Sequence, residues 1–422
     1  MPTDSLLAAP GSASPLAGLI GPIIPGFFSV DELGLAFLVC MAILAALLFL
    51  CTPATTSFFR HLVLLFFFFT GVFGLLTAVN VVTFFGCWEL CSLFAWAIGE
   101  AAGGSDTSDE AVIPFQAAGA LGSFAMFFGL ALLVVNRHSL LLGPAQPNHL
   151  TAVVPLLLLG VILKTYGILS EEWNRRDSHG FSVAGATLAG AGVLAIGIYP
   201  FFRLFGQVLA GIPGWREPIE WVAAFLAILA ALAALGEVDF RRALAYGAFS
   251  QFWLLILVYS VGSQMAILGA MIGAAADALA FTGLFLAISA AEEATAQVLF
   301  RRVGGLAQRL PLTATLFVVS AVSIVGLPPL GSFLADGFLS LAATGSSWLP
   351  IIWMIVGGLT MAYLVRLFAA LFLGELRGPV KAERRWSVVL AGGGVVGTLA
   401  LLATLATSLL ALLEPVTRSF PG

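Results

Sequence analysis

The sequence predicts an all-α polytopic membrane protein with about 12 transmembrane helices, arranged as two inverted five-helix repeats that each contain a broken helix. Composition is the first reason: hydrophobic residues make up 60% of the 422 residues and charged residues only 9%, with a mean hydropathy of +1.06. Soluble domains have about 25% charged residues. The second reason is that apolar segments of near-spanning length recur along the whole chain, and the third is that Gly and Pro interrupt two of them.

Residues 1–30 are rich in Pro and Gly and only weakly hydrophobic, and they lack the basic start and the cleavage site of a signal peptide. We interpret them as an ordered or interfacial tail. The segments that follow each approach the roughly 20 residues that a spanning helix needs. They lie at 31–51, 59–78, 80–101, 113–136, 149–171, 181–208, 217–236, 243–262, 264–290, 311–336, 349–374 and 387–412. Whether the tail forms a thirteenth span stays an open question.

The basic residues of the loops predict the orientation, because Lys and Arg of short loops stay on the cytoplasmic side. The ends of successive segments are assigned to alternate sides of the membrane. One side then has most of the basic residues, and the opposite side has little beyond Arg137, Arg216 and Arg418. Both termini are therefore expected to be extracytoplasmic. The residues assigned to the cytoplasmic side are Arg60, Arg175, Arg176, Arg241, Arg242, Arg301, Arg302, Arg309, Arg377, Lys381, Arg384 and Arg385.

Glu89 lies near the middle of an apolar run, VVTFFGCWELCSLFAWAIGE. A charge at the centre of a spanning helix costs about 2.5–3.5 kcal/mol on insertion scales, so such residues usually face a protein interior or a hydrated cavity and serve ion pathways. A structural hydrogen bond to a neighbouring helix is the alternative. Cys87 and Cys91 flank Glu89 at one-turn spacing, and we interpret them as packing residues rather than metal ligands.

Further ionisable residues occur inside predicted spans. Lys164 follows nine residues of apolar helix and precedes Gly167, and Asp277 lies mid-span. Asp336 follows a segment interrupted by Gly-Leu-Pro-Pro, which contains Pro328 and Pro329. Interrupted helices free backbone groups that can form ion sites, so we expect departures from regular helix at 164–167 and at 326–331. Arg366 lies near a cytoplasmic end and is interpreted as an anchoring or packing residue.

The spans divide into an N-terminal tail (1–30), a first helix (31–58), a first five-helix unit (59–208), a second five-helix unit (209–374) and a cytoplasmic loop with a last helix (375–422). Lys164 and Asp336 then occupy the fourth helix of their units. Because five is an odd number, two successive five-helix units run with opposite topology, and ionisable groups are expected near the membrane midplane. Glu89, Lys164, Asp277 and Asp336 should therefore lie at one depth.

Four blocks of sequence carry a resemblance to a known family. They are NVVTFFGCWELCSLFAWAIG, LLLLGVILKTYGILSEEW, GEVDFRRALAYGAFSQFWLLI and RVGGLAQRLPLTATLFVVSAVSIVGLPPLGSF. In this order they resemble the antiporter-like proton-translocating membrane subunits of complex I, multisubunit cation/proton antiporters, membrane-bound hydrogenases and inorganic-carbon uptake complexes. The resemblance implies that Glu89 and Lys164 are the ionisable pair of the first half, that Gly167, Pro328 and Pro329 lie in broken helices, and that the chain is in a bacterial-type inner (plasma) membrane.

The chain departs from that family at five ionisable positions. Where members have a second lysine, this chain has Leu194 and Ala195, and where a histidine precedes a lysine by four residues it has Asp277 and Phe281. Glu171 stands where a histidine is expected, and Asp336 stands where members have lysine or glutamate. The resemblance therefore implies ion translocation through Glu89, Lys164, Asp277, Asp336 and Glu171, with an incomplete set of lysines.

Two functional classes stay open. The first is a proton- or cation-translocating subunit of a larger membrane complex, and the alternative is a non-conducting helical scaffold of the same fold that connects or seals the complex. The sequence lacks a phosphate-binding loop, a spaced His/Cys metal set and a nucleophile elbow, so we expect no catalytic site and no cofactor in this chain. A complex I-like oxidoreductase activity would lie in partner subunits. The expected partners are other membrane subunits, the lipid bilayer and protons or monovalent cations, and dispersed basic residues argue against nucleic acid.

Overall fold

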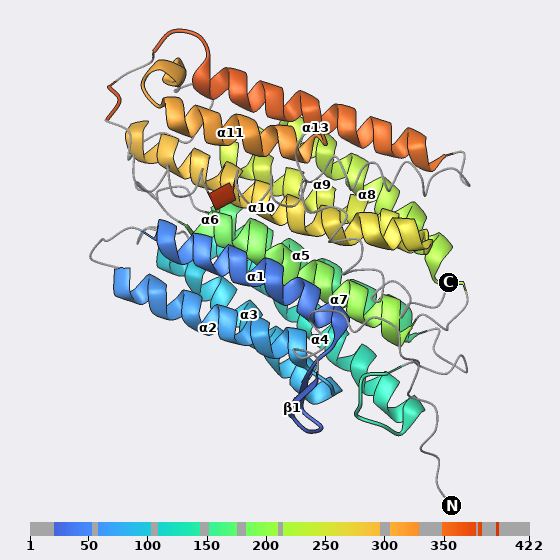
Figure 1. Cartoon of the computed structure of the whole chain (residues 1–422). Coiled ribbons are helices and arrows are strands. Elements are labelled where there is room, and N and C mark those ends of the chain that lie inside the picture. The colour runs from blue at the N-terminus through green and yellow to red at the C-terminus, as the bar shows by residue number, and fades with distance from the viewer. Residues whose placement is uncertain are drawn as a thin grey trace, which may run out of the picture.

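Long helices that run roughly side by side make up most of the structure, a computed structural model (Figure 1). The structure describes residues 21–52, 58–102, 109–143, 152–174, 183–209, 214–295, 304–328, 348–376, 379–381 and 394–395. The helices are α1 (Glu32–Cys51), α2 (Phe58–Thr77), α3 (Val81–Ala102), α4 (Asp109–Arg137), α5 (Val153–Asn174), α6 (Ala184–Ala186), η2 (Thr187–Ile198), α7 (Tyr199–Phe201), η3 (Phe202–Val208), α8 (Arg216–Gly236), α9 (Phe240–Ser260), α10 (Gln264–Thr295), η5 (Leu306–Gln308), α11 (Pro311–Ile324) and α13 (Leu349–Phe372).

Among the described residues, ten helices are long and apolar enough to cross a membrane, with α6 to η3 counted as one span from Ala184 to Val208. The polytopic helical fold is confirmed. The predicted segment 311–336 is described only to Pro328, where α11 covers its first part, and of 387–412 only residues 394–395 are described. Gly394 lies against Leu47 of α1 and Val395 against Gly283 of α10. The number of about 12 spans stays a prediction.

The described part of the tail begins at residue 21. Strands β1 (Gly21–Ile24) and β2 (Phe28–Val30) form an antiparallel hairpin, and Phe28 makes an isolated bridge with Ala78 between α2 and α3. Asp31 then begins α1, because its Oδ1 accepts a hydrogen bond of 2.7 Å from the Gly34 amide and so satisfies a free N–H of the first turn. The hairpin therefore covers the ends of α2 and α3.

The two expected helix interruptions have different outcomes. The expectation at 164–167 is wrong, because α5 continues as α-helix from Val153 to Asn174. A single Gly in a helix costs only about 1 kcal/mol, and the segment contains no residue that lacks a backbone N–H. At the second site α11 ends at Ile324, and Gly326 has a positive φ of 76°. The amides of Gly326 and Leu327 donate back to the carbonyls of Ser323 and Val322, which is the bonding pattern of a Schellman cap, and the turn continues to Pro328.

The span from Ala184 to Val208 is the core of the described structure, since every residue of its most hydrophobic window is buried. It consists largely of π-helical turns, in η2 and η3, and it packs against α3, α5, α9 and α10. In Figure 1 helices α2, α3 and α4 occupy the lower part of the view and α10, α11 and α13 the upper part, with α1 beside α10. An inverted symmetry between two five-helix units stays a prediction.

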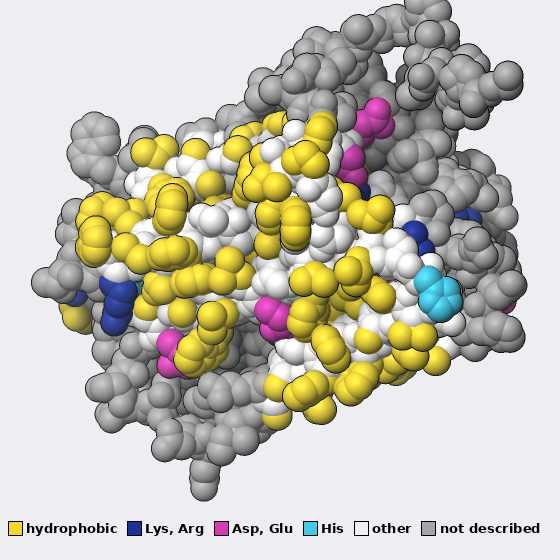
Figure 2. All heavy atoms as spheres, turned by 90° about the horizontal axis from the view of Figure 1, so that it is seen from below, with side chains coloured by type: hydrophobic (Ala, Val, Ile, Leu, Met, Phe, Trp, Pro, Cys, Tyr) yellow, Lys and Arg dark blue, Asp and Glu magenta, His cyan; other side chains and the backbone are white. Residues whose placement is uncertain are grey.

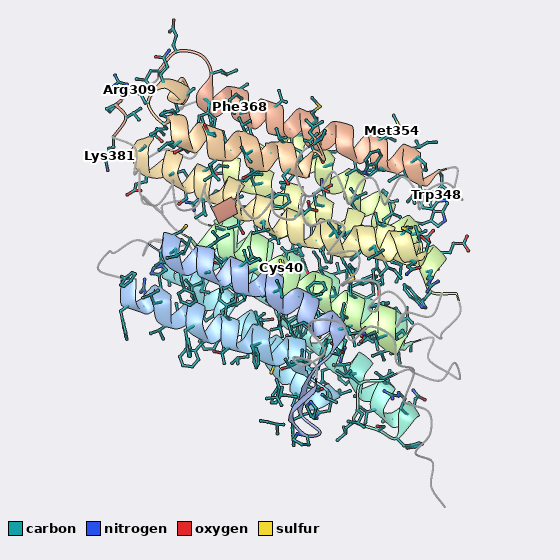
Figure 3. The ribbon with its side chains drawn as sticks, viewed as in Figure 1. Cys40, Arg309, Trp348, Met354, Phe368 and Lys381 are labelled. Atoms are coloured by element: carbon teal, nitrogen blue, oxygen red, sulfur yellow. The ribbon has the colours of Figure 1, made fainter. Side chains whose placement is uncertain are left out.

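Arg309 and Lys381, both assigned to the cytoplasmic side, lie at the same end of the bundle (Figure 3). Trp348, which precedes α13, lies at the opposite end. At the end that contains Arg309 and Lys381, the Gly305 amide donates to the Leu373 carbonyl at 2.9 Å. The Lys381 amide donates to the Ala294 carbonyl at 2.9 Å. These backbone bonds tie the segments around α10, η5 and α13 together.

Candidate functional site

Helices α3 and α5 bring Glu89 and Lys164 together inside the bundle. Lys164 Nζ lies 2.9 Å from Glu89 Oε2 and 3.1 Å from Oε1, so the ammonium contacts both carboxylate oxygens. The Lys164 side chain is 8% exposed and that of Glu89 is 33% exposed. The two residues lie 75 positions apart in the sequence. They form an ion pair inside the helix bundle, where an isolated charge would be costly.

Two other side chains hold the Lys164 ammonium. Ser123 of α4 accepts a hydrogen bond from Nζ through its hydroxyl oxygen, and the ring of Trp88 lies beneath the ammonium with 5.0 Å between Nζ and the ring centroid. Trp88 is fully buried, and its Nε1 donates to the carbonyl of Ile196 in η2 at 2.9 Å. The indole is therefore fixed against the core span while its face stabilises the positive charge.

Glycines let α4 and α5 approach closely at this site. A Cβ atom on Gly160 of α5 would lie 2.9 Å from the amide nitrogen and from the Cβ of Met126, and one on Gly122 of α4 would lie 3.0 Å from the Lys164 amide nitrogen. Such contacts leave room only for a hydrogen at each position. Small residues at membrane helix contacts allow backbones to meet in this way. The contact puts Ser123 within reach of the Lys164 ammonium.

A cavity of about 410 Å³ adjoins the ion pair. Glu89, Ser92, Gly119, Ser123, Lys164 and Gly167 are among the residues that line it, together with apolar groups such as Leu93 and Trp96. Trp96 is 39% exposed and Phe124 of α4 is 62% exposed. The face seen from below Figure 1 is largely hydrophobic and has isolated acidic side chains within it (Figure 2). A partly exposed carboxylate at membrane depth needs a polar or protein neighbour.

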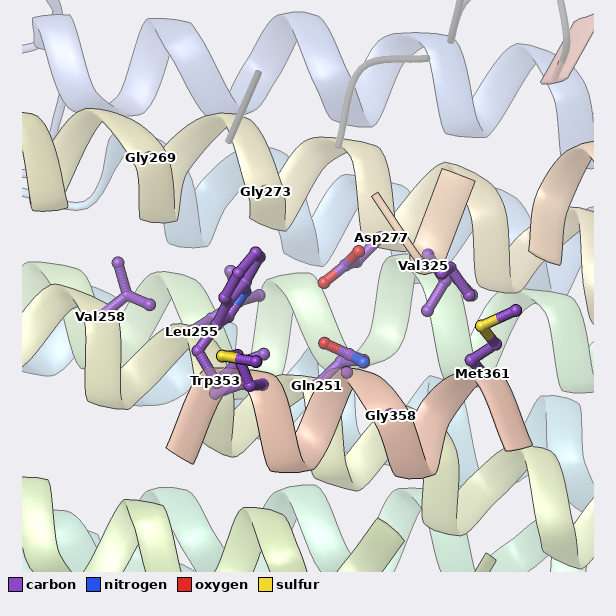
Figure 4. A pocket seen from close by; sticks show the side chains of 14 residues that line it. Gln251, Leu255, Val258, Gly269, Gly273, Asp277, Val325, Trp353, Gly358 and Met361 are labelled. Atoms are coloured by element: carbon purple, nitrogen blue, oxygen red, sulfur yellow. The ribbon is translucent and has the colours of Figure 1, made fainter. Parts of the chain in front are cut away.

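A second cavity, of about 290 Å³, contains Asp277. Gln251 of α9 and Asp277 of α10 project into it from facing sides, and Trp353, Gly358 and Met361 of α13 form another wall (Figure 4). Gln251 Nε2 donates to the Thr360 hydroxyl at 3.1 Å, which orients the amide oxygen of Gln251 away from Thr360. Asp277 therefore lies in a largely apolar cavity that the amide of Gln251 also lines.

The sequence matches the profile of the family described as "NADH:quinone oxidoreductase/Mrp antiporter, TM" over residues 78–362, which is more than half of the chain. The chain belongs to this family. The matched region contains Glu89, Lys164 and Asp277 with both cavities.

Two curated relatives within this family illustrate the range of matches. NAD(P)H-quinone oxidoreductase chain 5 of Picosynechococcus is 27% identical over 387 residues, which cover 83% of this chain and 56% of that protein. One of the Na(+)/H(+) antiporter subunits of Alkalihalophilus pseudofirmus is 28% identical over 237 residues, which cover 55% of this chain and 48% of that protein. The chain spans about half the length of the curated relatives it matches.

Chains of solved structures share the fold of this protein. A chain of respiratory complex I from Thermus thermophilus superimposes with a TM-score of 0.78 at 23% identity, over 96% of this chain and 89% of that chain. A chain of the Mrp complex from a Dietzia species gives a TM-score of 0.79 at 20% identity, over 93% and 85% of the two chains. At this level of identity the likeness supports the fold.

Several residues that the sequence singled out lie outside the part of the chain that the structure describes. Asp336 and Pro329 lie outside the described residues, as does the side chain of Glu171. A common membrane depth for the four ionisable residues therefore stays a prediction. Leu194 and Ala195, at the positions where the resemblance implies a lysine, are buried in η2.

Two further ion pairs, one buried and one partly exposed, were not predicted from the sequence. Arg241 of α9 binds Glu292 of α10 with Nε at 3.0 Å from Oε1 and 2.8 Å from Oε2, and both side chains are at most 5% exposed. Arg203 of η3 binds Asp31 at the start of α1 and also donates to Gln207 at 2.6 Å. Glu292 was overlooked because the predicted span ends at 290, although α10 continues to Thr295. Arg203 lies inside the predicted segment 181–208 and its charge could have identified it.

The Arg241–Glu292 pair lies beside a helix start at the predicted cytoplasmic end. Asp239 begins α9 by accepting hydrogen bonds from the amides of Arg241 at 2.9 Å and Arg242 at 3.1 Å. Burial raises the pKa of Asp239, while these amides and the two arginines favour its charged form. Arg366 of α13 donates to the carbonyl of Ala234 at 3.2 Å near the end of α8, which agrees with the packing role expected for it.

Proposed function

We propose that this chain is an ion-translocating, antiporter-like subunit of a larger membrane complex, in which protons or monovalent cations move through a buried axis of Glu, Lys and Asp side chains. The observation that carries the proposal is the Glu89–Lys164 ion pair, held by Ser123 and Trp88 beside a cavity of about 410 Å³. Intramembrane ionisable residues that face a cavity and pair with one another are typical of proton relays.

Glu89 and Lys164 act as a switch in this proposal. While the carboxylate is within 3 Å, it favours the charged form of the lysine. A charge change in a neighbouring protein of the complex draws Glu89 away or neutralises it, Lys164 loses its partner, and the ammonium releases a proton. Restoring the pair reloads Lys164. The 33% exposure of the Glu89 side chain supports this, because that carboxylate reaches the surface where a neighbour can act on it.

The second half of the pathway uses carboxylates in place of the missing lysines. Asp277, in its own cavity of about 290 Å³, is the exchange group of α10. Asp336 and Glu171 complete the axis on sequence grounds. The buried apolar stretch around Leu194 and Ala195 separates α5 from α10, so charge passes between the halves through rearrangement of the ion pairs rather than through a lysine at this position.

The partners in this proposal are other membrane subunits, one of which covers the hydrophobic face that contains Glu89. The apolar residues exposed on α3 and α4 support this, since Glu89 in their midst would otherwise meet lipid. The chain is placed in a bacterial-type inner membrane with both termini extracytoplasmic, and its two five-helix units are inverted repeats. Redox chemistry, where it is coupled, belongs to partner subunits.

The test is ion flux per assembled complex. The complex is isolated through an affinity tag on this chain and reconstituted into vesicles, and a potassium diffusion potential drives proton flux, read by a pH-sensitive dye enclosed in the vesicles. The variants are Glu89→Gln, Lys164→Met and the double variant, with subunit composition measured in the same preparations. The same assay with and without sodium distinguishes protons from sodium ions.

For a switch, each single substitution abolishes flux per complex and the double variant does not restore it. Removing one partner of a buried pair can also cost about 3–5 kcal/mol, so the amount of assembled complex is needed for the comparison. The scaffold alternative gives the opposite pattern: flux per complex is the same in all variants, and assembly suffers in the single variants and recovers in the double. That result would reject the proposed function.

A further inference from the structure

We propose that Ser123 relays protons between Lys164 and the adjoining cavity, an inference that rests on the proposed ion-translocating function. Ser123 lies on α4 and directly follows Gly122, the residue at which α4 meets the backbone of α5. Its hydroxyl contacts Lys164 Nζ and also lines the cavity of about 410 Å³. No feature of the sequence singled it out, because serine is common in membrane helices.

Three oxygen atoms surround the Lys164 ammonium. An ammonium has three N–H donors. In this site two of them are directed to Glu89 Oε1 and Oε2, and the third is directed to the Ser123 oxygen. The Trp88 ring covers a further side of Nζ. A proton that leaves Lys164 therefore has either the Glu89 carboxylate or the Ser123 hydroxyl as its first acceptor.

Both acceptors border the cavity, but they differ in what happens to the pair. Transfer to Glu89 neutralises both members of the pair and keeps the proton between them. Transfer to Ser123 leaves the Glu89 charge in place and passes a proton on to the cavity. The Ser123 hydroxyl also donates to the Gly119 carbonyl at 3.1 Å. Its own proton therefore points away from Lys164, and a lone pair of its oxygen faces the ammonium.

The relay step is a concerted transfer. The Ser123 hydroxyl rotates from the Gly119 carbonyl to a water molecule in the cavity, which is an ordinary motion of a serine hydroxyl. The Lys164 N–H bond then breaks as a new O–H bond forms on Ser123, while the original Ser123 O–H bond breaks and its proton passes to the water. Lys164 becomes a neutral amine, Ser123 is again a hydroxyl, and the water becomes hydronium. The reverse sequence reloads Lys164.

Substitutions of nearly equal shape distinguish a relay role of Ser123 from a packing role. Thr and Val differ in little more than a hydroxyl against a methyl group, so Ser123→Thr keeps the relay and Ser123→Val removes it. The control is Ser260→Ala: the Ser260 hydroxyl of α9 also donates four residues back, to the Ile256 carbonyl at 2.8 Å, and Ser260 is not among the residues that line the cavity. Unlike Ser123, it is not among the groups that hold Lys164.

The measurement is proton flux per assembled complex in reconstituted vesicles, in H₂O and in D₂O. Positioned proton-transfer groups typically contribute about 10²–10⁴-fold to a rate, so we expect Ser123→Val to lose at least about tenfold. Ser123→Thr should stay within about twofold of the unmodified chain, as should Ser260→Ala. The residual flux of Ser123→Val should show a larger solvent isotope effect, because proton transfer then limits it.

Equal flux for the Thr and Val variants would overturn the relay, whether both are active or both are inactive. Lys164→Met in the same assay separates this failure from that of the proposed function. If Lys164→Met abolishes flux and Ser123→Val does not, the relay is wrong and ion translocation stands. If Lys164→Met conducts normally, the proposed function itself is wrong.

Discussion

Lys164 lies over the face of Trp88, with 5.0 Å between its Nζ and the centroid of the indole ring. The same indole donates from Nε1 to the Ile196 carbonyl of η2 at 2.9 Å. One side chain thus connects the ion pair of α3 and α5 to the buried core span. This connection can be tested separately from ion flux.

Trp88→Phe is expected to lower stability by about 1–2 kcal/mol. The substitution removes a buried interhelical hydrogen bond, worth about 0.6 kcal/mol on average in a membrane protein. It also weakens the attraction between ring and ammonium, which contributes about 0.5–2 kcal/mol. Thermal unfolding in detergent, followed by reaction of the buried thiols Cys40 and Cys91 with a dye, measures the change. Trp96→Phe, at a 39% exposed position, is the control and should shift the midpoint little.

Gly160→Ala is expected to separate α4 from α5 and to reduce both stability and flux. The added methyl group would lie 2.9 Å from Met126 backbone and side-chain atoms, so the helices must move. Gly86→Ala is the control, because a Cβ at Gly86 of α3 meets no atom within 4 Å. That substitution should be neutral or stabilising by up to about 1 kcal/mol, since Ala favours helix over Gly. Equal effects of the two changes would show that the close helix contact is unimportant.

Arg241→Met and Glu292→Leu should each destabilise the chain by about 3–5 kcal/mol, because each leaves one buried charge without its partner. The double variant should be much less destabilised, since two apolar residues can replace a buried pair. The amount of folded protein in the membrane and the midpoint of thermal unfolding are measured for the two single variants and the double variant. Comparison of the three gives the coupling between Arg241 and Glu292. Glu375→Gln, at an exposed position, is the control. Additive losses in the double variant would mean that the pair is not coupled.

Asp277→Asn should abolish ion flux while the complex assembles normally. The amide keeps the size of the side chain and can still bond within its cavity, but it cannot bind and release a proton. Met361→Leu, on the wall of the same cavity, changes its lining without changing charge and should keep most of the flux. Proton flux per complex in reconstituted vesicles is the measurement. Full activity of Asp277→Asn would remove this residue from the proposed pathway.

Local sequence was sufficient for the spans but not for every break in them. The ends of α1, α3, α8 and α13 agree with the predicted segments within a few residues, because the hydrophobic thickness of a bilayer limits helix length. Gly326 ends α11 as expected, since the sequence around it favours a left-handed residue followed by proline. Gly167 does not interrupt α5, because a lone glycine loses no backbone hydrogen bond.

The sequence by itself determined that the chain is a polytopic membrane protein and that Glu89 and Lys164 are exceptional, because composition and the cost of charge in a membrane are readable one residue at a time. Only the tertiary structure decided that these two form a pair, that Ser123 and Trp88 hold the lysine, and that Glu292 binds Arg241. Those partners come from different helices, and Glu89 and Lys164 are 75 residues apart. Their contacts follow from which helix faces meet, as at Gly122 and Gly160, and helix packing of this kind is a property of shape that no single segment contains.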